Sequence, residues 1–433
     1  MTTTLARAAL TVCLIAGTPL MAENRIDTLR PDAPALAPHG DYPVGVRTLT
    51  LTDPDRIDIL NVTEDSIPTY DRSLTVEMWY PAAPGTEPGT VYDTIIRNGD
   101  PTQLHGMAAR DAAPASDATF PVVIISHGYP GNRLLMGHLG ENLASKGYVT
   151  VSIDHTDSIY SDQGAFGSTL VNRPLDQRFV LDQLGDADVI GADLAAISDS
   201  ETAAVIGYSM GGYGALIYGG AGVTQLSVDY PWGAPRGLLG AHLAGSDTHK
   251  ALTDDPRLKA VIAIGPWGRN LNFWDAAGMA GISRPLMLMA GGVDDVSSYA
   301  AMRAMFDEAT GTARHLLTFN HANHNAAAPM PAPAEAIAAT PAGEQSPADH
   351  YLDAVWDTVR MNNIAQHFAT AFLNQHLKAE GDMAAYLDLV PNADDGVASL
   401  NEDGSAKDDH TYWSGFAPRS ATGLRFETKQ AGE

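Results

Sequence analysis

A serine flanked by glycines stands where an apolar run gives way to a helical pattern. The chain reads Gly207-Tyr208-Ser209-Met210-Gly211 directly after the run 203–206, and the helical pattern follows at 210–219. A sharp strand-to-helix turn of this kind exposes the serine hydroxyl at the carboxyl end of a sheet, and glycines on either side leave room for the strained backbone. The helix N-terminus beneath the turn favours developing negative charge. We therefore predict that Ser209 is a nucleophile.

A nucleophilic serine needs a histidine as its base and a carboxylate that orients the histidine. In folds with this turn the order along the chain is serine, acid, histidine. Asp294 and Asp295 follow one apolar run after the serine, and His321 and His324 follow the next. We prefer Asp294 because the following Val-Ser can re-enter a helix, and His324 because a loop of a few residues must carry the ring back over the sheet. Asp295 and His321 are the alternates.

Two backbone amides, those of Tyr129 and Met210, are the predicted donors to the oxyanion that such a reaction creates. Met210 directly follows the serine. Tyr129 lies in the loop after the first wholly apolar run, where Gly128 lets the backbone turn an N–H inward. Three tryptophans are candidate apolar walls for the substrate: Trp267, Trp232 and Trp274.

The segments that must position these residues alternate between strand and helix patterns. Period-two alternation at 46–51 and 74–80 predicts an antiparallel pair at a sheet edge. Wholly apolar runs then predict strands buried on both faces, at 121–125, 148–153, 203–206, 260–264, 285–289 and 315–319. Helical patterns lie at 133–146, 174–198, 210–219, 296–309 and 350–378. This order predicts an α/β fold of the α/β-hydrolase layout, a mostly parallel sheet with helices on both faces.

Three segments exceed that layout, and we expect one enlarged domain over 23–379 that contains two of them. Residues 220–255 are rich in Gly, Pro and aromatic residues and fall between two strands, so we interpret them as an inserted cap. Residues 326–348 form an Ala/Pro-rich loop, either a lid or a disordered connection. Residues 380–433 form a polar tail that we expect to pack on the domain.

In the order and surroundings of its motifs, the chain resembles a branch of the α/β-hydrolases. This branch holds dienelactone hydrolases, platelet-activating-factor acetylhydrolases and cutinase-like polyester hydrolases. The resemblance covers roughly 42–378 and is closest over 122–157, 203–214 and 261–325.

The three groups of this branch differ in how they match the chain. Dienelactone hydrolases have a cysteine at the position of Ser209. The acetylhydrolases place their acid after the strand that here ends in Gly265-Pro266-Trp267, where no carboxylate stands. Cutinase-like enzymes place it one strand later, as Asp294 is placed. The resemblance to them implies that Tyr129 and Trp267 line the acyl cleft.

The first 22 residues have the pattern of a secretory signal. Arg7 precedes an apolar run of about ten residues, and small residues lead to a cut after Ala22. The run is too short to span a bilayer, and no other segment is apolar enough. We therefore expect an exported protein, periplasmic or secreted, without stable membrane anchoring. The single cysteine, Cys13, lies in this signal, so the mature chain would carry no thiol.

Charge and motif content exclude several kinds of partner. Acidic residues number 52 against 26 basic ones, a net charge of −26, and such a surface repels nucleic acid and anionic lipid. The chain contains no ligand spacing typical of a metal site and no glycine-rich nucleotide motif, so we expect neither a metal nor another cofactor. We expect a monomer or dimer.

Together these residues predict a serine carboxylic ester hydrolase that works through an acyl-enzyme, on a small or medium ester or on a polyester. A serine peptidase or amidase would use the same triad, and a phospholipid acetylhydrolase-like lipase is a further alternative. A non-catalytic hydrolase-like binding protein is more remote, because no member of the triad is missing.

Overall fold

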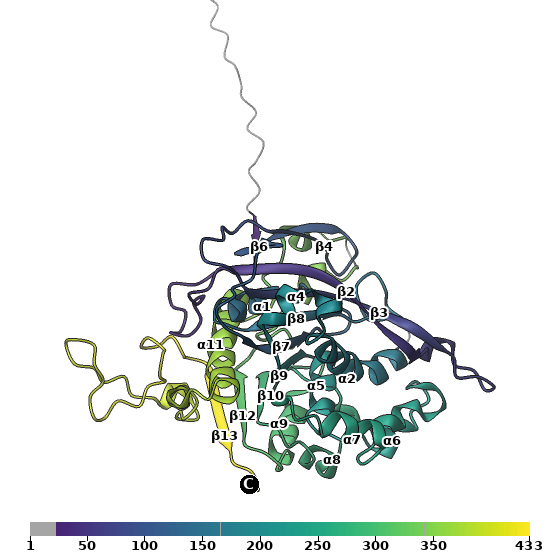
Figure 1. Cartoon of the computed structure of the whole chain (residues 1–433). Helices are drawn as coiled ribbons and strands as arrows, with labels where there is room; N and C mark the ends of the chain where they lie inside the picture. The colour runs from purple at the N-terminus through teal and green to yellow at the C-terminus, as the bar shows by residue number, and fades with distance from the viewer. Residues whose placement is uncertain (1–22, 165, 339, 342) are drawn as a thin grey trace, which may run out of the picture.

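Apolar runs bounded by Gly, Pro or Asp build the strands of one large sheet. The computed structural model describes residues 23–164, 166–338, 340–341 and 343–433. Its ten-stranded sheet has the strand order β13-β12-β11-β10-β9-β7-β8-β3-β2-β6 (Figure 1). The strands are β2 (Val44–Ile57), β3 (Thr69–Pro81), β6 (Ala108–Arg110), β7 (Phe120–Ser126), β8 (Val149–Asp154), β9 (Ser198–Tyr208), β10 (Leu258–Ile264), β11 (Leu286–Gly291), β12 (Arg314–Phe319) and β13 (Leu424–Lys429).

The middle of the sheet is parallel and buried on both faces. The strands β8, β7, β9, β10, β11 and β12 pair in parallel in that order. Every residue of β8, β11 and β12 is buried, which explains why their sequences are apolar runs without alternation. Because parallel strands point the same way, the turns that follow them meet at one edge of the sheet. The six predicted core strands are confirmed.

The antiparallel lead-in is also confirmed, and it is longer than its sequence pattern. β2 pairs with β3 from Val44 opposite Pro81 to Ile57 opposite Thr69, with an irregularity between Asp53 and Arg56. β3 then pairs antiparallel with β8. This pair joins the parallel core at the β8 side.

Helices cover both faces of the sheet, as the α/β class predicts. α1 and α11 pack into the apolar cluster on one face, and α2, α5 and α9 into the cluster on the other (Figure 1). The helices are α1 (Gly137–Ser145), α2 (Phe166–Gln183), α3 (Ala187–Ile190), α4 (Ala192–Ile197), α5 (Met210–Tyr218), α6 (Gln225–Val228), α7 (Asp247–Thr253), α8 (Ala276–Ala280), α9 (Tyr299–Glu308), α10 (Ala334–Ile337) and α11 (Thr358–Leu377).

Two helices differ from the boundaries that the sequence pattern predicts. The pattern places a helix over 174–198, but α2 begins at Phe166, contains Pro174 and ends at Gln183, with α3 and α4 after it. The Leu170 carbonyl, which Pro174 leaves without its helical donor, accepts from the Tyr213 hydroxyl of α5 at 3.2 Å. The pattern also places a helix over 350–378. There α11 begins at Thr358, because the Asp357 side chain caps it by accepting from the Arg360 amide at 2.8 Å.

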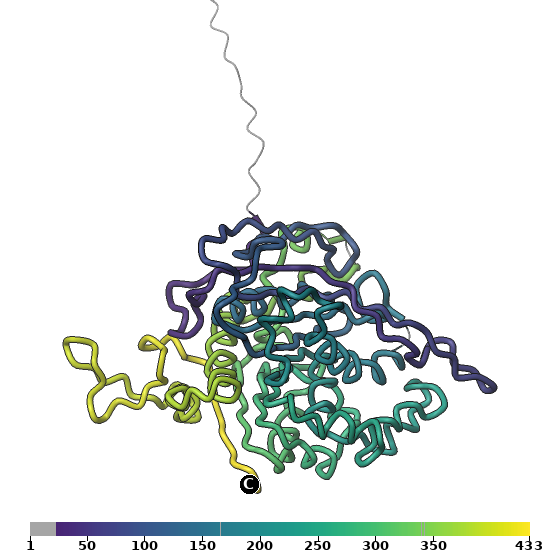
Figure 2. The backbone as a smooth tube through the Cα atoms, in the orientation of Figure 1, coloured from purple at the N-terminus to yellow at the C-terminus, as the bar shows by residue number. Residues whose placement is uncertain are grey.

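The segments outside the core layout take separate positions. Residues 220–255 form α6, the 3-10 helix η2 (Pro235–His242) and α7, and His242 Nε2 donates to the Val171 carbonyl of α2 at 2.8 Å. Residues 380–433 loop out beside α11 and then return as β13, which pairs antiparallel with β12 (Figure 2). A small second sheet contains β1 (Asn24–Arg25), β5 (Pro101–His105) and β4 (Val91–Ile95). The sequence pattern predicted neither β13 nor this small sheet.

None of the helices that the structure describes is long and apolar enough to cross a membrane. The predicted secretory signal, residues 1–22 with Cys13, lies outside the described residues.

Candidate active site

Ser209 occupies a strained turn between β9 and α5. β9 ends at Tyr208 and α5 begins at Met210, and Ser209 between them has φ 52° and ψ −112°. A side chain on Gly207 would lie 2.1 Å from the Gly211 carbonyl oxygen, and one on Gly211 would lie 1.9 Å from that of Ser126. Both positions therefore require glycine. A strained φ at a serine that the surroundings fix so closely is typical of a functional site.

The structure brings three of the predicted side chains into one hydrogen-bonded chain. The Ser209 hydroxyl lies 3.0 Å from His324 Nε2, and His324 Nδ1 lies 2.8 Å from Asp294 Oδ2. Because an ionised carboxylate only accepts, Nδ1 carries the proton that His324 donates to Asp294, and Nε2 is free to accept from the serine. This is the geometry that a serine nucleophile with its base requires.

The two alternates do not join this chain. Asp295 is exposed and lines the cavity in front of Ser209. His321 is exposed on the turn before His324, with φ 62°. Asp294, in contrast, is buried, and its Oδ1 accepts from the amides of Val296 and Ser297 at 2.9 and 2.8 Å.

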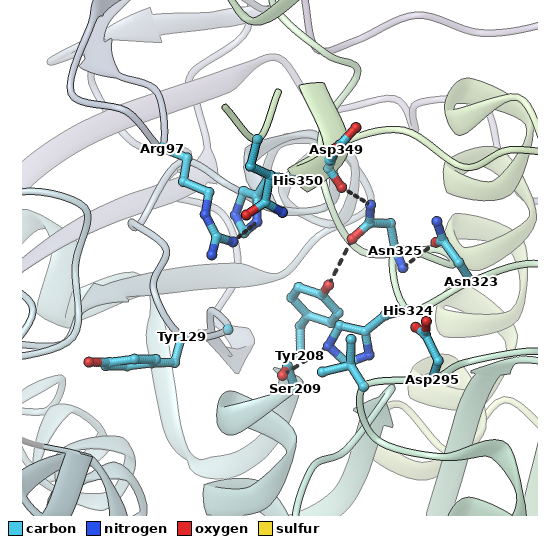
Figure 3. A pocket seen from close by; sticks show the side chains of 13 residues that line it. Arg97, Tyr129, Tyr208, Ser209, Asp295, Asn323, His324, Asn325, Asp349 and His350 are labelled. Atoms are coloured by element: carbon cyan, nitrogen blue, oxygen red, sulfur yellow. Dashed lines mark hydrogen bonds between the residues drawn. The ribbon is translucent and has the colours of Figure 1, made fainter. Parts of the chain in front are cut away.

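The loop that carries His324 is fixed by asparagines on either side of it. The main-chain N–H of Asn323 donates to Asp353 Oδ2 at 2.6 Å, and the side-chain amide of Asn325 donates to the Leu352 carbonyl at 2.7 Å. The Tyr208 hydroxyl donates to Asn325 Oδ1 at 3.3 Å, and the Tyr208 ring lies 5.2 Å from that of His324 (Figure 3). Sequence reasoning missed this support, because its partners follow the Ala/Pro-rich loop 326–348.

The peptide group that joins Gly128 to Tyr129 is fixed by hydrogen bonds to its carbonyl oxygen. The Gly128 carbonyl accepts from His127 Nδ1 at 2.6 Å and from the Arg173 guanidinium at 2.9 Å. In a trans peptide the C=O and N–H point in opposite directions, so the Tyr129 N–H points away from Arg173. A side chain on Gly128 would lie 3.4 Å from Ser209 Cβ, which places this peptide beside the serine. Within the described part of the chain, neither the Tyr129 nor the Met210 amide donates to a protein acceptor.

A second Ser-His-Asp set lies beneath that loop and is fully buried. His155 Nε2 lies 2.8 Å from the Ser126 hydroxyl, and its Nδ1 lies 2.9 Å from Asp176 Oδ2. Burial lowers the pKa of His155 to about 3, so the imidazole is neutral. Burial raises the pKa of Asp176, but the Arg72 charge, the His155 hydrogen bond and the Arg56 charge together outweigh it and hold this pKa below its usual range. No member of the set reaches solvent, so the set is a structural support and not a second active site.

The cavity in front of Ser209 has a volume of about 450 Å³ and is lined by polar and charged side chains (Figure 3). Ser209, His324 and Tyr129 line it together with Arg97 and His350. None of the described residues of 220–255, which we interpreted as a cap, lines this cavity. The cavity is instead lined in part by residues within or just after the loop 326–348, namely Gln345, Asp349 and His350.

The candidate tryptophans lie at different depths. Trp267 packs against the ring of Phe166 at 5.3 Å between centroids, and the Tyr129 ring packs against the same phenylalanine at 5.2 Å. Trp232 extends this aromatic surface and is 46% exposed. Trp274 is fully buried, so it packs in the core and does not reach the cavity. Tryptophan content alone could not separate these cases.

In the part of the chain that the structure describes, no three His, Cys, Asp or Glu side chains gather closely enough to hold a metal ion.

Comparison with known proteins places these residues among related sequences. Residues 110–234 match the family model described as PET hydrolase-like. The chain is 25% identical over 213 residues to cutinase est1 of Thermobifida alba, covering 49% of this chain and 55% of that protein. It is 28% identical over 160 residues to cutinase 2 of Thermobifida cellulosilytica, covering 37% of this chain and 45% of that protein. The chain thus spans about half the length of these relatives.

A solved structure extends the likeness to the whole fold. The ferulic acid esterase from Streptomyces cinnamoneus superimposes with a TM-score of 0.57 at 20% identity, over 83% of this chain and 94% of that one. At this identity the match establishes the shared fold.

Proposed function

We propose that this protein, an α/β-hydrolase related to the cutinase-like polyester hydrolases, is a serine carboxylic ester hydrolase. The observation that carries the proposal is the continuous chain of hydrogen bonds from Ser209 through His324 to Asp294. The resemblance to this branch, predicted from the motifs, is confirmed by the sequence relatives, and the predicted fold class by the solved structure.

The proposed reaction passes through an acyl-enzyme. Ser209 Oγ attacks the ester carbonyl carbon while His324 Nε2 takes the hydroxyl proton, and Asp294 stabilises the imidazolium that forms. The Tyr129 and Met210 amides donate to the oxyanion of the tetrahedral intermediate. His324 then gives its proton to the departing alkoxide, and the alcohol leaves.

Water completes the cycle by the same route in reverse. It attacks the acyl carbon while His324 takes its proton. The second tetrahedral intermediate then collapses as His324 returns that proton to Ser209 Oγ, which releases the carboxylic acid and restores the serine. Tyr129 lines the cavity and packs on Phe166, which packs on Trp267, so these three rings are the candidate apolar wall for the acyl group.

Hydrolysis of p-nitrophenyl acetate and butyrate tests this proposal. We expect the wild-type chain to cleave both, and Ser209→Ala to lose at least about 10³-fold in kcat. A Ser209→Ala variant as active as the wild type would refute it. A fluorophosphonate that fails to label Ser209 in the folded protein would instead favour a non-catalytic binding protein.

A parallel assay with p-nitroanilide analogues of the same acyl chains separates an esterase from a peptidase or amidase. A platelet-activating-factor acetylhydrolase-like lipase has less support, because the turn after β10 carries Gly265-Pro266-Trp267 and no carboxylate.

Export is part of the same proposal. The signal pattern at 1–22 predicts a periplasmic or secreted protein whose mature chain begins at Glu23. Mass spectrometry of the exported protein tests the cut. Size-exclusion chromatography with light scattering tests the expected monomer or dimer.

A further inference from the structure

Arg97 brings a guanidinium into the cavity that holds Ser209. It lies in the turn between β4 and β5, in the small sheet, and lines the same cavity as Ser209 and His324. Figure 3 shows its side chain extending towards the space that Tyr208 and Ser209 face. The three residues come from segments far apart in the sequence, and the cavity is where they meet.

The charge of Arg97 is not neutralised by the protein. Its guanidinium donates to His350 Nδ1 at 3.0 Å, and burial lowers the pKa of His350 to about 3, so this imidazole is neutral. By contrast, Arg133 pairs with Asp154 at 2.6 Å and with Glu77 at 2.9 Å. Among the described residues, no carboxylate lies within 4.0 Å of the Arg97 guanidinium, although Asp295 and Asp349 line the same cavity.

His350 holds the guanidinium in place. It is buried, and its ring packs edge-on against Tyr160 at 5.5 Å and Tyr351 at 5.2 Å. The contact to Arg97 uses one of five N–H donors of the guanidinium. The remaining donors form a planar fork that suits the two oxygens of a carboxylate.

We propose that Arg97 binds a free carboxylate of the substrate, so that the enzyme prefers half-esters of dicarboxylic acids to the neutral diesters. This inference rests on the proposed ester hydrolysis. The carboxylate pairs with Arg97 while the ester carbonyl lies at Ser209, and the cavity of about 450 Å³ accommodates a short diacid chain between the two points. A neutral diester offers no anion to pair with the guanidinium.

The surface charge makes a local cation necessary for such a substrate. A net charge of −26 repels anions at long range, so an anionic substrate needs a specific partner inside the cavity. This background also defines the control, because removal of a positive charge elsewhere changes the long-range repulsion without changing the cavity. Arg236 is a suitable position. It is exposed, lies in the segment 220–255 and contacts the Thr63 carbonyl at 3.4 Å.

The test compares monoethyl adipate with diethyl adipate, with ethanol release as the measurement. We expect Arg97→Gln to lower the ratio of kcat/KM values, half-ester over diester, by about ten- to a hundred-fold, the range of a charged hydrogen-bonded pair. Arg97→Lys should retain part of the ratio, and Arg236→Gln should lower it by less than about twofold, because it alters only the screened long-range repulsion. An equal loss on both substrates in Arg97→Gln, or an equal change of the ratio in Arg236→Gln, would overturn the inference.

A binding measurement separates this inference from the proposed function. Titration calorimetry measures the affinity of adipate for Ser209→Ala and for Ser209→Ala combined with Arg97→Gln. We expect binding to the first protein and about tenfold or greater weakening in the second. Adipate binding that depends on Arg97, found together with a wild-type protein that cleaves no ester, would support the carboxylate site and refute the esterase. Ester cleavage by the wild type, together with an adipate affinity that does not depend on Arg97, would support the esterase and refute the carboxylate site.

Discussion

The Nδ1 of His324 lies 2.8 Å from Oδ2 of Asp294, whereas the side chain of Asp295, the next residue, lines the open cavity. The other carboxylate oxygen of Asp294 accepts from the Val296 and Ser297 amides. Three hydrogen bonds therefore fix the carboxylate and, through it, the imidazole. This arrangement distinguishes two neighbouring acids that the sequence leaves as alternatives.

We predict that Asp294→Asn lowers kcat by about 10³- to 10⁴-fold, because an amide in place of the carboxylate disfavours the tautomer with a proton on Nδ1. Asp295→Asn, a matched change one residue away, should alter kcat by less than about tenfold, since His324 hydrogen-bonds to Asp294 and not to Asp295. Steady-state kinetics with p-nitrophenyl butyrate measures both. A larger loss in Asp295→Asn than in Asp294→Asn would assign the acid to Asp295.

Arg173 gives a second prediction, on the proposed oxyanion donors. It is buried and donates to the carbonyls of His127 and Gly128. We expect Arg173→Lys, which keeps the charge but not the fork, to lower kcat by about 10²-fold with little change in KM, because the Tyr129 amide would no longer be fixed for the transition state.

Two controls show whether a lower kcat in Arg173→Lys comes from a misplaced Tyr129 amide. Arg178→Lys alters another arginine of α2, one that contacts the Ala251 carbonyl, and should leave kcat near the wild-type value. Thermal unfolding shows whether each variant is folded. A folded Arg173→Lys protein with wild-type kcat would exclude the role.

Most of the fold, and the meeting of the three candidate triad residues, could be predicted from the sequence for one physical reason. Strands buried on both faces are wholly apolar runs, and parallel strands place their following turns at one edge of the sheet. A serine, an acid and a histidine that each follow such a run therefore lie at the same edge. Ser209, Asp294 and His324 follow β9, β11 and β12 in this way.

The remaining features depend on contacts that no local pattern carries. β13 is short and partly polar, and it becomes a strand only because the edge of β12 is available. Arg97 meets His350 across 253 positions of sequence. Trp274 is buried and Trp232 is exposed because of how each packs in the fold, which the residue type alone does not reveal. The Ala/Pro-rich loop gives no sign that the residues after it support His324.

The tail provides a third prediction. Phe426 on β13 is buried, and its ring stacks on that of Phe368 in α11 at a centroid distance of 4.8 Å. We expect Phe426→Ala to lower the free energy of unfolding by about 3–5 kcal/mol, the cost of removing a buried phenyl ring. Lys429→Ala on the same strand, which removes a surface ion pair with Asp307, should cost less than about 1 kcal/mol. Denaturant unfolding measures both, and equal values would show that the tail does not stabilise the core.

His138 in α1 leads to a prediction on pH. It is fully buried, neither ring nitrogen has a hydrogen-bond partner among the described residues, and burial lowers its pKa from 6.5 to about 3. Below pH 6.5 the His138 side chain is protonated in the unfolded chain but stays neutral in the folded protein. The free energy of unfolding therefore decreases as the pH falls from 6.5 towards 3. At pH 5 this loss is about 2 kcal/mol.

Denaturant unfolding of the wild type and of His138→Met at pH 7.5 and at pH 5 tests this. We expect the free energy of unfolding of His138→Met, relative to that of the wild type, to be higher at pH 5 than at pH 7.5 by about 2 kcal/mol. A difference between the two proteins that does not change with pH would show that His138 is protonated equally in the folded and unfolded chains.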